Sequence, residues 1–130
     1  MIEQAGKKKM LLFSGSSNVE LASKVASNLG TELSTVESKE FASGEIYIRL
    51  NESVRGADCF VLQSHSGDVN KTIMEQLVLV DALKRASAKR ITAVLPFYPY
   101  SRQDKKALPR EPITARLIGD MFIAAGVDRL

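Results

Sequence analysis

The sequence has little that could fix it covalently or hold it in a membrane. Its 130 residues include one cysteine, one histidine and no tryptophan. No disulfide can form within the chain, and the apolar run Cys59–Leu62 predicts a buried thiol in a reducing, intracellular compartment. No apolar run approaches the roughly 18 residues of a membrane helix. The first residues also lack the apolar stretch of a secretory signal, so we expect a cytoplasmic protein without a membrane partner.

Familiar catalytic and phosphate-binding patterns are missing as well. The single histidine, His65, has no second metal ligand or carboxylate partner near it in the sequence, so we expect a polar turn residue. No Ser/His/Asp or Cys/His arrangement can be assembled. Gly15 is not followed by the glycines of a dinucleotide fingerprint, and no Gly-Lys-Ser/Thr phosphate loop is present. The sequence therefore does not support nucleophilic catalysis or a metal-binding role for His65, and nucleotide binding would need another device.

The chain is close to neutral outside its first residues. Its net charge is +3, but Lys7, Lys8 and Lys9 against Glu3 contribute +2, which leaves +1 for the remainder. Nucleic-acid binders normally have a broad basic face, so we expect no nucleic-acid partner. A module that binds nucleic acid through one basic loop stays open, and its affinity would fall steeply with salt. The length predicts one domain over residues 1–130, with residues 1–9 as a disordered leader.

Apolar runs and helical spacings alternate along the chain. Strands that alternate with helices are typical of an α/β fold with a mainly parallel sheet flanked by helices. The last strand is cut short, so the domain is expected to be incomplete at its carboxyl end. The apolar runs predict strands at 10–13, 33–36, 46–50, 59–62 and 91–95 and a strand entry at 127–130, and the helical spacings predict helices at 19–29, 69–86 and 112–126.

Local patterns add detail to this outline. Ser17 and Glu20 have the spacing of a capping box, and Gly30 is suited to end the helix. Ile46–Leu50 alternates as a half-exposed strand that projects to an edge or a partner, whereas the strand at 91–95 is expected to be buried on both faces. The long helix has a wide apolar stripe made of Ile73, Leu77, Val80 and Lys84, with Met74, Val78, Asp81 and Ala82 nearby.

Two turns could either bind a ligand or simply connect elements. Ser14–Asn18 leads into a helix amino terminus, whose free N–H groups can hold an anion. Ordinary helix capping explains the same residues. Phe41–Glu45 is a small-residue turn with an aromatic ring at one end and a carboxylate at the other. A plain connecting turn, with Phe41 in the core, explains it equally well.

The most informative segment is the loop from Tyr98 to Pro112, which follows the strand at 91–95. Ligands of open parallel sheets bind beyond the carboxyl ends of such strands. Arg102 can stack on a flat ring, and the Gln103 amide can both donate to and accept from an adenine edge. The alternative for this segment is a solvated charged loop.

Three further cations of this loop are candidates for phosphate contacts. Lys105, Lys106 and Arg110 could neutralise a transferring phosphoryl group. Asp104 and Glu111 halve the local excess of positive charge, which fits a solvated face. The position of the loop beyond a strand end favours the phosphate contact.

Four segments in the same order resemble the ribose-phosphate diphosphokinase (phosphoribosyl pyrophosphate synthetase) family. The resemblance runs from about Met10 to the last residue and corresponds to the amino-terminal half of the family. It implies a phosphoribosyltransferase-like fold and an enzyme that transfers the diphosphoryl group of ATP to ribose 5-phosphate with magnesium, for nucleotide biosynthesis. The segments are Phe41–Glu45, Glu52–Gly56, Asp81–Lys89 and Pro96–Lys106.

The resemblance also implies roles for individual residues and an assembly. It gives no catalytic or metal-binding residue in this chain, because the family's metal-binding histidine, catalytic lysine and acidic ribose-phosphate loop lie in segments that are absent here. It implies a homohexamer built from dimers, and a chain that is inactive alone. Ser43 departs from the Asp or Asn usual in the family, and a non-catalytic regulatory homologue that assembles with the enzyme is the alternative. The implied ATP-binding residues are Phe41, Ser43, Gly44, Glu45, Arg102 and Gln103.

Overall fold

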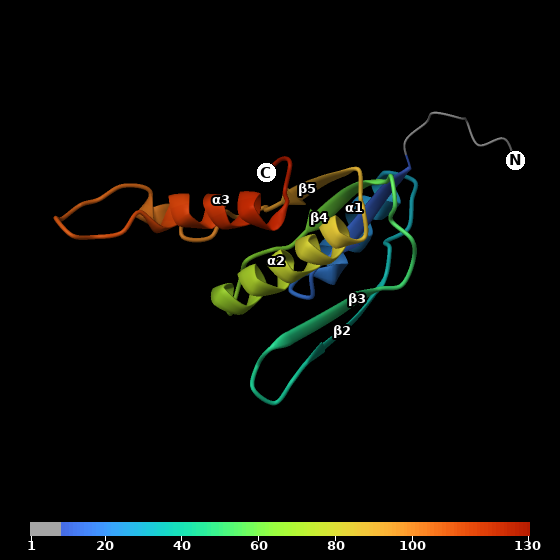
Figure 1. Cartoon of the computed structure of the whole chain (residues 1–130), viewed down its shortest axis with the longest axis horizontal. Coiled ribbons are helices and arrows are strands. Elements are labelled where there is room, and N and C mark those ends of the chain that lie inside the picture. Colours follow the sequence, from blue (N-terminus) through green and yellow to red (C-terminus); the bar gives the residue numbers. More distant parts are fainter. Residues whose placement is uncertain (1–8) are drawn as a thin grey trace, which may run out of the picture.

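The computed structural model describes residues 9–130, which form a sheet with helices on both faces (Figure 1). Residues 1–8, most of the expected disordered leader, lie outside the described residues. The Lys9 carbonyl already accepts a hydrogen bond from the Asp58 N–H at 2.8 Å. In chain order the elements are β1 (Met10–Ser14), α1 (Val19–Asn28), β2 (Val36–Glu40), β3 (Ile46–Leu50), β4 (Asp58–Leu62), α2 (Val69–Arg85), β5 (Arg90–Val94), η1 (Ser101–Gln103) and α3 (Thr114–Ala125).

Three strands form a parallel sheet in the order β1-β4-β5. Leu11 on β1 pairs with Cys59 on β4, and Cys59 pairs with Ile91 on β5. Beyond β5, Arg129 pairs in parallel with Thr92, so the expected strand entry near the carboxyl end is confirmed. Strands β2 and β3 form a separate antiparallel hairpin. The predicted α/β fold, with a mainly parallel sheet flanked by helices, is confirmed.

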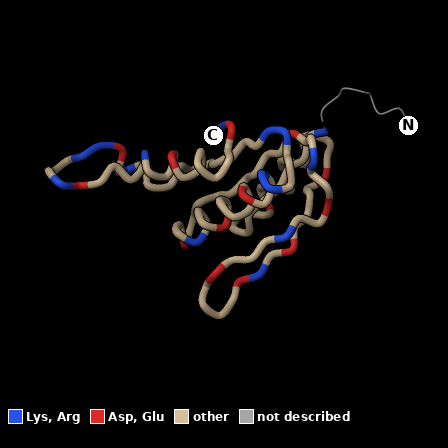
Figure 2. Tube along the Cα trace, in the orientation of Figure 1, with Lys and Arg blue, Asp and Glu red and all other residues tan. Residues whose placement is uncertain are grey.

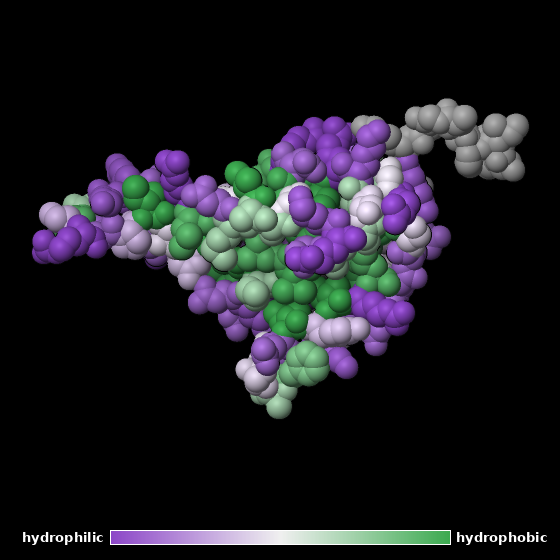
Figure 3. Space-filling view, in the orientation of Figure 1, coloured by the Kyte–Doolittle hydropathy of each residue, from purple (hydrophilic) through white to green (hydrophobic). Residues whose placement is uncertain are grey.

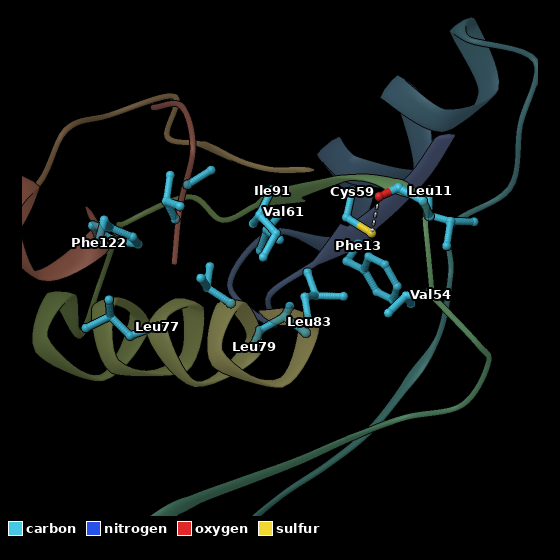
Figure 4. Close-up of a cluster of buried hydrophobic side chains, with 14 of the residues drawn as sticks. Leu11, Phe13, Val54, Cys59, Val61, Leu77, Leu79, Leu83, Ile91 and Phe122 are labelled. Atoms are coloured by element: carbon cyan, nitrogen blue, oxygen red, sulfur yellow. Dashed lines mark hydrogen bonds between the residues drawn. The ribbon is translucent and has the colours of Figure 1, made fainter. Parts of the chain in front are cut away.

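Side chains of the parallel strands enter two apolar clusters, because successive residues of a strand point to opposite faces. On one face, α2 and α3 cover a large cluster that includes Phe13, Cys59 and Val61 (Figure 4). On the other face, α1 packs against Leu12 and Leu62. The sheet is thus a rigid base whose strand ends can position loops.

Cys59 is fully buried in the larger cluster, as the sequence predicts. Its thiol donates a weak hydrogen bond to the Ala57 carbonyl at 3.9 Å (Figure 4). Burial, together with the nearby Asp58 and Glu52 carboxylates, raises the pKa of Cys59 to about 11. Because the thiolate is the reactive form, this cysteine is chemically inert at neutral pH.

The start of α1 differs from the predicted capping box. Asn18 caps the helix, with its side chain accepting the Leu21 N–H at 3.1 Å. The Ser17 hydroxyl instead donates to the Ser64 carbonyl in the loop after β4. The capping box is wrong because a contact between loops has taken the hydroxyl that the pattern requires.

Three element predictions need correction. Ser34 makes one hydrogen bond to β1, but the strand expected there begins only at Val36, where the chain turns into the hairpin. β5 is not buried on both faces, since Val94 is 37% exposed on the face that α1 covers only in part. Helix α3 begins at Thr114 and not at Pro112. For the two strands, the apolar pattern located the strand but did not show which elements pack beside it.

The buried face of α2 contains Ile73, Leu77 and Val80 of the expected stripe and further residues beside them. Leu79 and Leu83 have no exposed surface, whereas Met74 is 52% exposed. Glu75 and Gln76 are buried between these apolar positions. The expected stripe is confirmed at Ile73, Leu77 and Val80, is wrong at the exposed Lys84, and lacks the polar residues of the buried face.

Two segments project from the sheet, namely the hairpin β2–β3 and the loop between η1 and α3 (Figure 1). Strand β3 alternates half-buried and exposed residues, as predicted. Lysine and arginine gather at the far end of the loop (Figure 2).

No helix within residues 9–130 is long and apolar enough to cross a membrane. An apolar surface lies along α2 and α3 (Figure 3), and Met74, Leu77, Val78, Met121, Ala124 and Ala125 contribute to it.

Candidate functional site

The loops after β1, β4 and β5 meet at the carboxyl ends of the strands. The Gly15 N–H donates to the Leu62 carbonyl at 2.9 Å, and the Gln63 N–H donates to the Val94 carbonyl at 3.2 Å. Beyond β5 lies a hollow of about 470 Å³, which is within the size range of small-molecule sites. Both loop residues expected to reach ATP line it. The full lining is Val69, Phe97, Tyr100, Ser101, Arg102 and Gln103.

Side-chain hydrogen bonds hold both ends of η1, the short helix that carries these residues. At its start, the Tyr100 hydroxyl donates to Asn70 Oδ1 on α2 at 2.5 Å, and the Tyr100 backbone is left-handed with φ of 64°. At its end, the Thr114 hydroxyl donates to Gln103 Oε1 at 2.6 Å. Arg102 lies between the two and is exposed. The backbone at Arg102 is therefore held in place, and the Arg102 side chain is open to a ligand.

Residues of the hairpin turn line a second hollow, of about 640 Å³, between the hairpin and α2. Ser43, Gly44 and Glu45 all contribute to it. The Ser43 hydroxyl donates to Glu45 Oε1 at 2.7 Å, so the serine binds within its own turn. Gly44 has φ of +94°, a conformation that favours glycine. Because Val69 lines the first hollow and Asn70 the second, the first turn of α2 separates the two halves of the expected ATP site within one chain.

Phe41 is 48% exposed at the base of this turn and is not a core residue. The Lys39 ammonium lies 5.4 Å from the Phe41 ring centroid and 5.1 Å from that of Tyr47. The two rings meet edge to face, with centroids 6.3 Å apart. The hairpin therefore displays an aromatic surface that already attracts a cation and can stack a flat group.

The cations of the projecting loop lie outside both hollows. Lys105, Lys106 and Arg110 are exposed and line neither of them. Glu111 shapes this loop, because its Oε1 accepts the backbone N–H groups of residues 107 and 108 at 2.9 and 2.7 Å. A phosphate contact by these cations therefore stays a prediction.

A buried carboxylate occupies the turn that was a candidate anion site. Glu75, only 6% exposed, accepts the Ser16 N–H at 3.2 Å on both oxygens and the Ser16 hydroxyl at 2.9 Å. Gln63 donates to the same carboxylate at 2.7 Å and accepts the Ser17 N–H at 3.2 Å. The N–H groups of Ser16 and Ser17 therefore already bind side chains of this chain.

His65 is buried, with 1% of its surface exposed, and is not the polar turn residue that was expected. Its Nδ1 lies 2.8 Å from the Thr72 hydroxyl, and its Nε2 lies 2.8 Å from Gln76 Oε1. Burial lowers the pKa of His65, and the hydrogen bond to Gln76 partly opposes this shift. The imidazole is therefore a structural link between the loop after β4 and α2.

The lowered pKa of His65 predicts a pH-dependent stability. The unfolded chain takes up the proton near its ordinary pKa of 6.5, before the folded chain does. The contribution of His65 to the free energy of unfolding is thus complete above about pH 6.5. It is lost as the pH falls toward the pKa of His65 in the folded chain. Urea unfolding between about pH 7 and 5.5 should show this loss, and His65→Gln should remove it. Equal pH profiles for the two proteins would contradict the prediction. As the only histidine, His65 also gives a single imidazole NMR titration.

The described residues do not provide a metal centre. No group of three or more histidine, cysteine, aspartate or glutamate side chains within residues 9–130 is arranged to hold an ion. Residues 9–130 therefore offer no such cluster of side chains for the magnesium that the family resemblance implies.

The fold and the hollow define an α/β protein whose candidate ligand site lies beyond the carboxyl ends of parallel strands. Residues 10–126 match the N-terminal domain of ribose phosphate pyrophosphokinase, and the chain belongs to this family. The resemblance found in the sequence is confirmed.

Individual relatives agree with this assignment. The chain is 59% identical over 123 residues to the ribose-phosphate pyrophosphokinase of Corynebacterium glutamicum, covering 95% of this chain and 38% of that protein. It is 56% identical over 124 residues to the enzyme of the same name from Mycobacterium tuberculosis, with the same coverage. The crystal structure of phosphoribosylpyrophosphate synthetase from Mycobacterium smegmatis matches with a TM-score of 0.93 at 56% identity, covering 94% of this chain and 41% of that one. The chain thus spans about two fifths of the length of these relatives.

Sequence reasoning missed part of the lining and all of the polar network. Val69 and Phe97 line the hollow, although neither was assigned a role from the sequence. Gln76 did carry a signal, because it lies three residues after Ile73 and therefore in phase with the apolar stripe. A polar residue in that phase indicates a buried hydrogen-bonded side chain.

Proposed function

We propose that this chain is the amino-terminal, ATP-binding part of a cytoplasmic ribose-phosphate pyrophosphokinase that transfers the diphosphoryl group of ATP to ribose 5-phosphate for nucleotide biosynthesis. One observation carries the proposal: Arg102 and Gln103 line a ligand-sized hollow beyond β5, on a short helix held at both ends. The names of the chain's relatives supply the reaction.

In this proposal the base of ATP lies between two surfaces. Arg102 stacks on one face of the adenine, and Gln103 binds its edge. Phe41 stacks on the other face from a neighbouring protomer, with Ser43, Gly44 and Glu45 in the same turn. The separation of the two hollows within one chain supports a site shared between protomers, and we propose a homohexamer built from dimers.

The triphosphate would extend from the base toward the basic loop, where Lys105, Lys106 and Arg110 offer positive charge. Phosphoryl transfer depends on positioning and on stabilising the moving charge. These loop cations alone do not surround a transferring group, since they lie on a projecting segment (Figure 2). We therefore propose no catalytic residue in this chain, and an isolated chain that binds ATP without turning it over. Magnesium would arrive as the complex with ATP.

A non-catalytic regulatory homologue is the second candidate. The hydrogen bond that Ser43 makes within its own turn favours it. The Ser43 hydroxyl is bound to Glu45 and not free for a ligand. A full-length protein that lacks a catalytic lysine would support this candidate.

The test is a paired substitution in the full-length protein. Arg102→Ala with Gln103→Ala should weaken ATP binding about 10- to 100-fold, because stacking and edge contacts of a base are worth roughly 1–3 kcal/mol. Ribose 5-phosphate binding should change little. Titration calorimetry with each substrate measures both affinities.

Arg85→Ala is the matched control, since Arg85 is an exposed arginine near the end of α2, outside both hollows. It should leave both affinities unchanged. An equal loss of both substrates in the double variant would count against the assignment of Arg102 and Gln103 to the nucleotide.

A further inference from the structure

We propose that the ion pair between Lys71 and Glu40 holds the turn of the hairpin β2–β3 at a set place beside α2, and that Lys71 is thereby a positioning residue for the nucleotide. The inference rests on the proposed function, because it concerns how the hairpin turn is held for ATP. Lys71 acts through Glu40, which directly precedes Phe41 in the chain.

The pair joins two segments whose backbones are held by their own hydrogen bonds. The Lys71 ammonium donates to Glu40 Oε1 at 2.9 Å, although the two residues lie 31 positions apart in the sequence. Lys71 is in the first turn of α2, where its N–H binds the cap residue Asp68 at 3.3 Å. Glu40 is the last residue of β2 and pairs with Ile46 across the hairpin. The ion pair therefore acts at the base of the turn, one residue away from Phe41.

Apolar packing holds the hairpin mainly away from its turn. Val36, at the start of β2, and Ile48 and Leu50 on β3 pack against the large apolar cluster. The remainder of β2 is exposed. The turn is at the free end of the projecting hairpin (Figure 1) and faces the hollow of about 640 Å³ that separates it from α2. A segment with few buried apolar contacts has little to fix its position, so a polar contact across the hollow can decide where the turn lies.

The hollow beside the turn is lined mainly by negative charge. Glu40, Glu45 and Asp68 contribute carboxylates, and Lys71 is the one cation among the described residues that line it. The hydrogen bond to Glu40 and the Glu40 charge raise the pKa of Lys71, so the ammonium stays charged at neutral pH. With a carboxylate in its place, like charges would face each other across the hollow and push the turn away from α2.

A turn that leaves this place binds ATP less tightly. Only the fraction of molecules with the turn in place presents Phe41 and its neighbours to the base, and the apparent affinity falls by that fraction. Exposed ion pairs are weak, so we expect a change of several-fold and not the loss of the site. The effect concerns ATP alone, because ribose 5-phosphate has no base to stack on the ring.

Charge reversals in the full-length protein test the pair. Lys71→Glu and Glu40→Lys should each weaken ATP binding about five- to tenfold and leave ribose 5-phosphate binding unchanged in titration calorimetry. The double variant K71E/E40K rebuilds the pair with its charges exchanged, and its ATP affinity should return to within about twofold of the wild type. Lys24→Glu is the matched control, since Lys24 is an exposed lysine on α1 that lines neither hollow. It changes the net charge as K71E does and should leave both affinities unchanged.

Glu40→Lys separates this role from a general attraction of ATP to positive charge. ATP is a polyanion, so a general attraction would make K71E bind it more weakly and E40K more tightly. An ion pair that holds the turn requires both single variants to bind ATP more weakly than the wild type.

Each outcome decides the inference. An E40K protein that binds ATP as tightly as the wild type, or a double variant no better than K71E, overturns the role of Lys71 while leaving the ATP site intact. An equal loss of ribose 5-phosphate binding also overturns it. A wild type that binds no ATP overturns the proposed function together with the inference. If a charge reversal does not fold, Lys71→Met and Glu40→Met replace the reversals, and each should weaken ATP binding about two- to threefold.

Discussion

Replacing Glu75 by alanine is expected to lower the free energy of unfolding by about 3–5 kcal/mol. The Glu75 carboxylate binds the backbone N–H and hydroxyl of Ser16 and the amide of Gln63. Hydrogen bonds to a charged group each contribute about 1.5–3 kcal/mol, and a buried donor left without a partner costs about 1–3 kcal/mol. Gln63 is only 1% exposed, so water cannot easily replace the lost acceptor.

Urea unfolding measures this effect, with Glu20→Ala as the matched control. Glu20 is an exposed glutamate in the first turn of α1, and its removal should change stability by less than about 0.5 kcal/mol. Glu75→Gln should also be strongly destabilising, because an amide nitrogen would then face donors of Ser16 or Gln63. A Glu75→Ala protein within about 1 kcal/mol of the wild type would show that the network does not hold the strand ends together.

The sheet could be predicted because its information is local. The apolar runs at Cys59–Leu62 and 91–95 alternate with helical spacings, and this order predicts a parallel sheet. The predictions that failed concern features that depend on contacts between distant segments. Ser17 has the pattern of a cap, yet its hydroxyl donates to the Ser64 carbonyl in the neighbouring loop. No local pattern reports such a bond.

The candidate site was predictable to a similar extent. Arg102 and Gln103 follow a strand end, and general rules for open sheets place a ligand there. The Thr114–Gln103 and Tyr100–Asn70 bonds were not foreseen, because each joins residues whose pairing depends on how a helix packs beside the loop. Phosphate contacts by the loop cations stay a prediction, since their partner is a ligand.

Replacing Gly15 by alanine is expected to cost about 2–4 kcal/mol, through the same network. Gly15 is buried directly against the Gln63 side chain, and an added Cβ would overlap the amide of that residue. This amide cannot simply move aside. It donates to Glu75 at 2.7 Å and to the Thr72 carbonyl at 3.3 Å, and it accepts the Ser17 N–H at 3.2 Å. The methyl group must therefore either shift β1 or break these bonds.

A double-mutant cycle with Gln63→Ala separates this cause from a general strain of the backbone. If the clash with Gln63 is the source, Gly15→Ala should cost far less in a Gln63→Ala background, because the overlapping atoms are gone. Urea unfolding of the four proteins gives the coupling energy. The same cost in both backgrounds would mean that Gly15 is required for its backbone, and that the network does not explain why a glycine ends β1. The cycle thus tests whether the polar network, and not the turn alone, sets the position of the strand ends beneath the candidate ligand site.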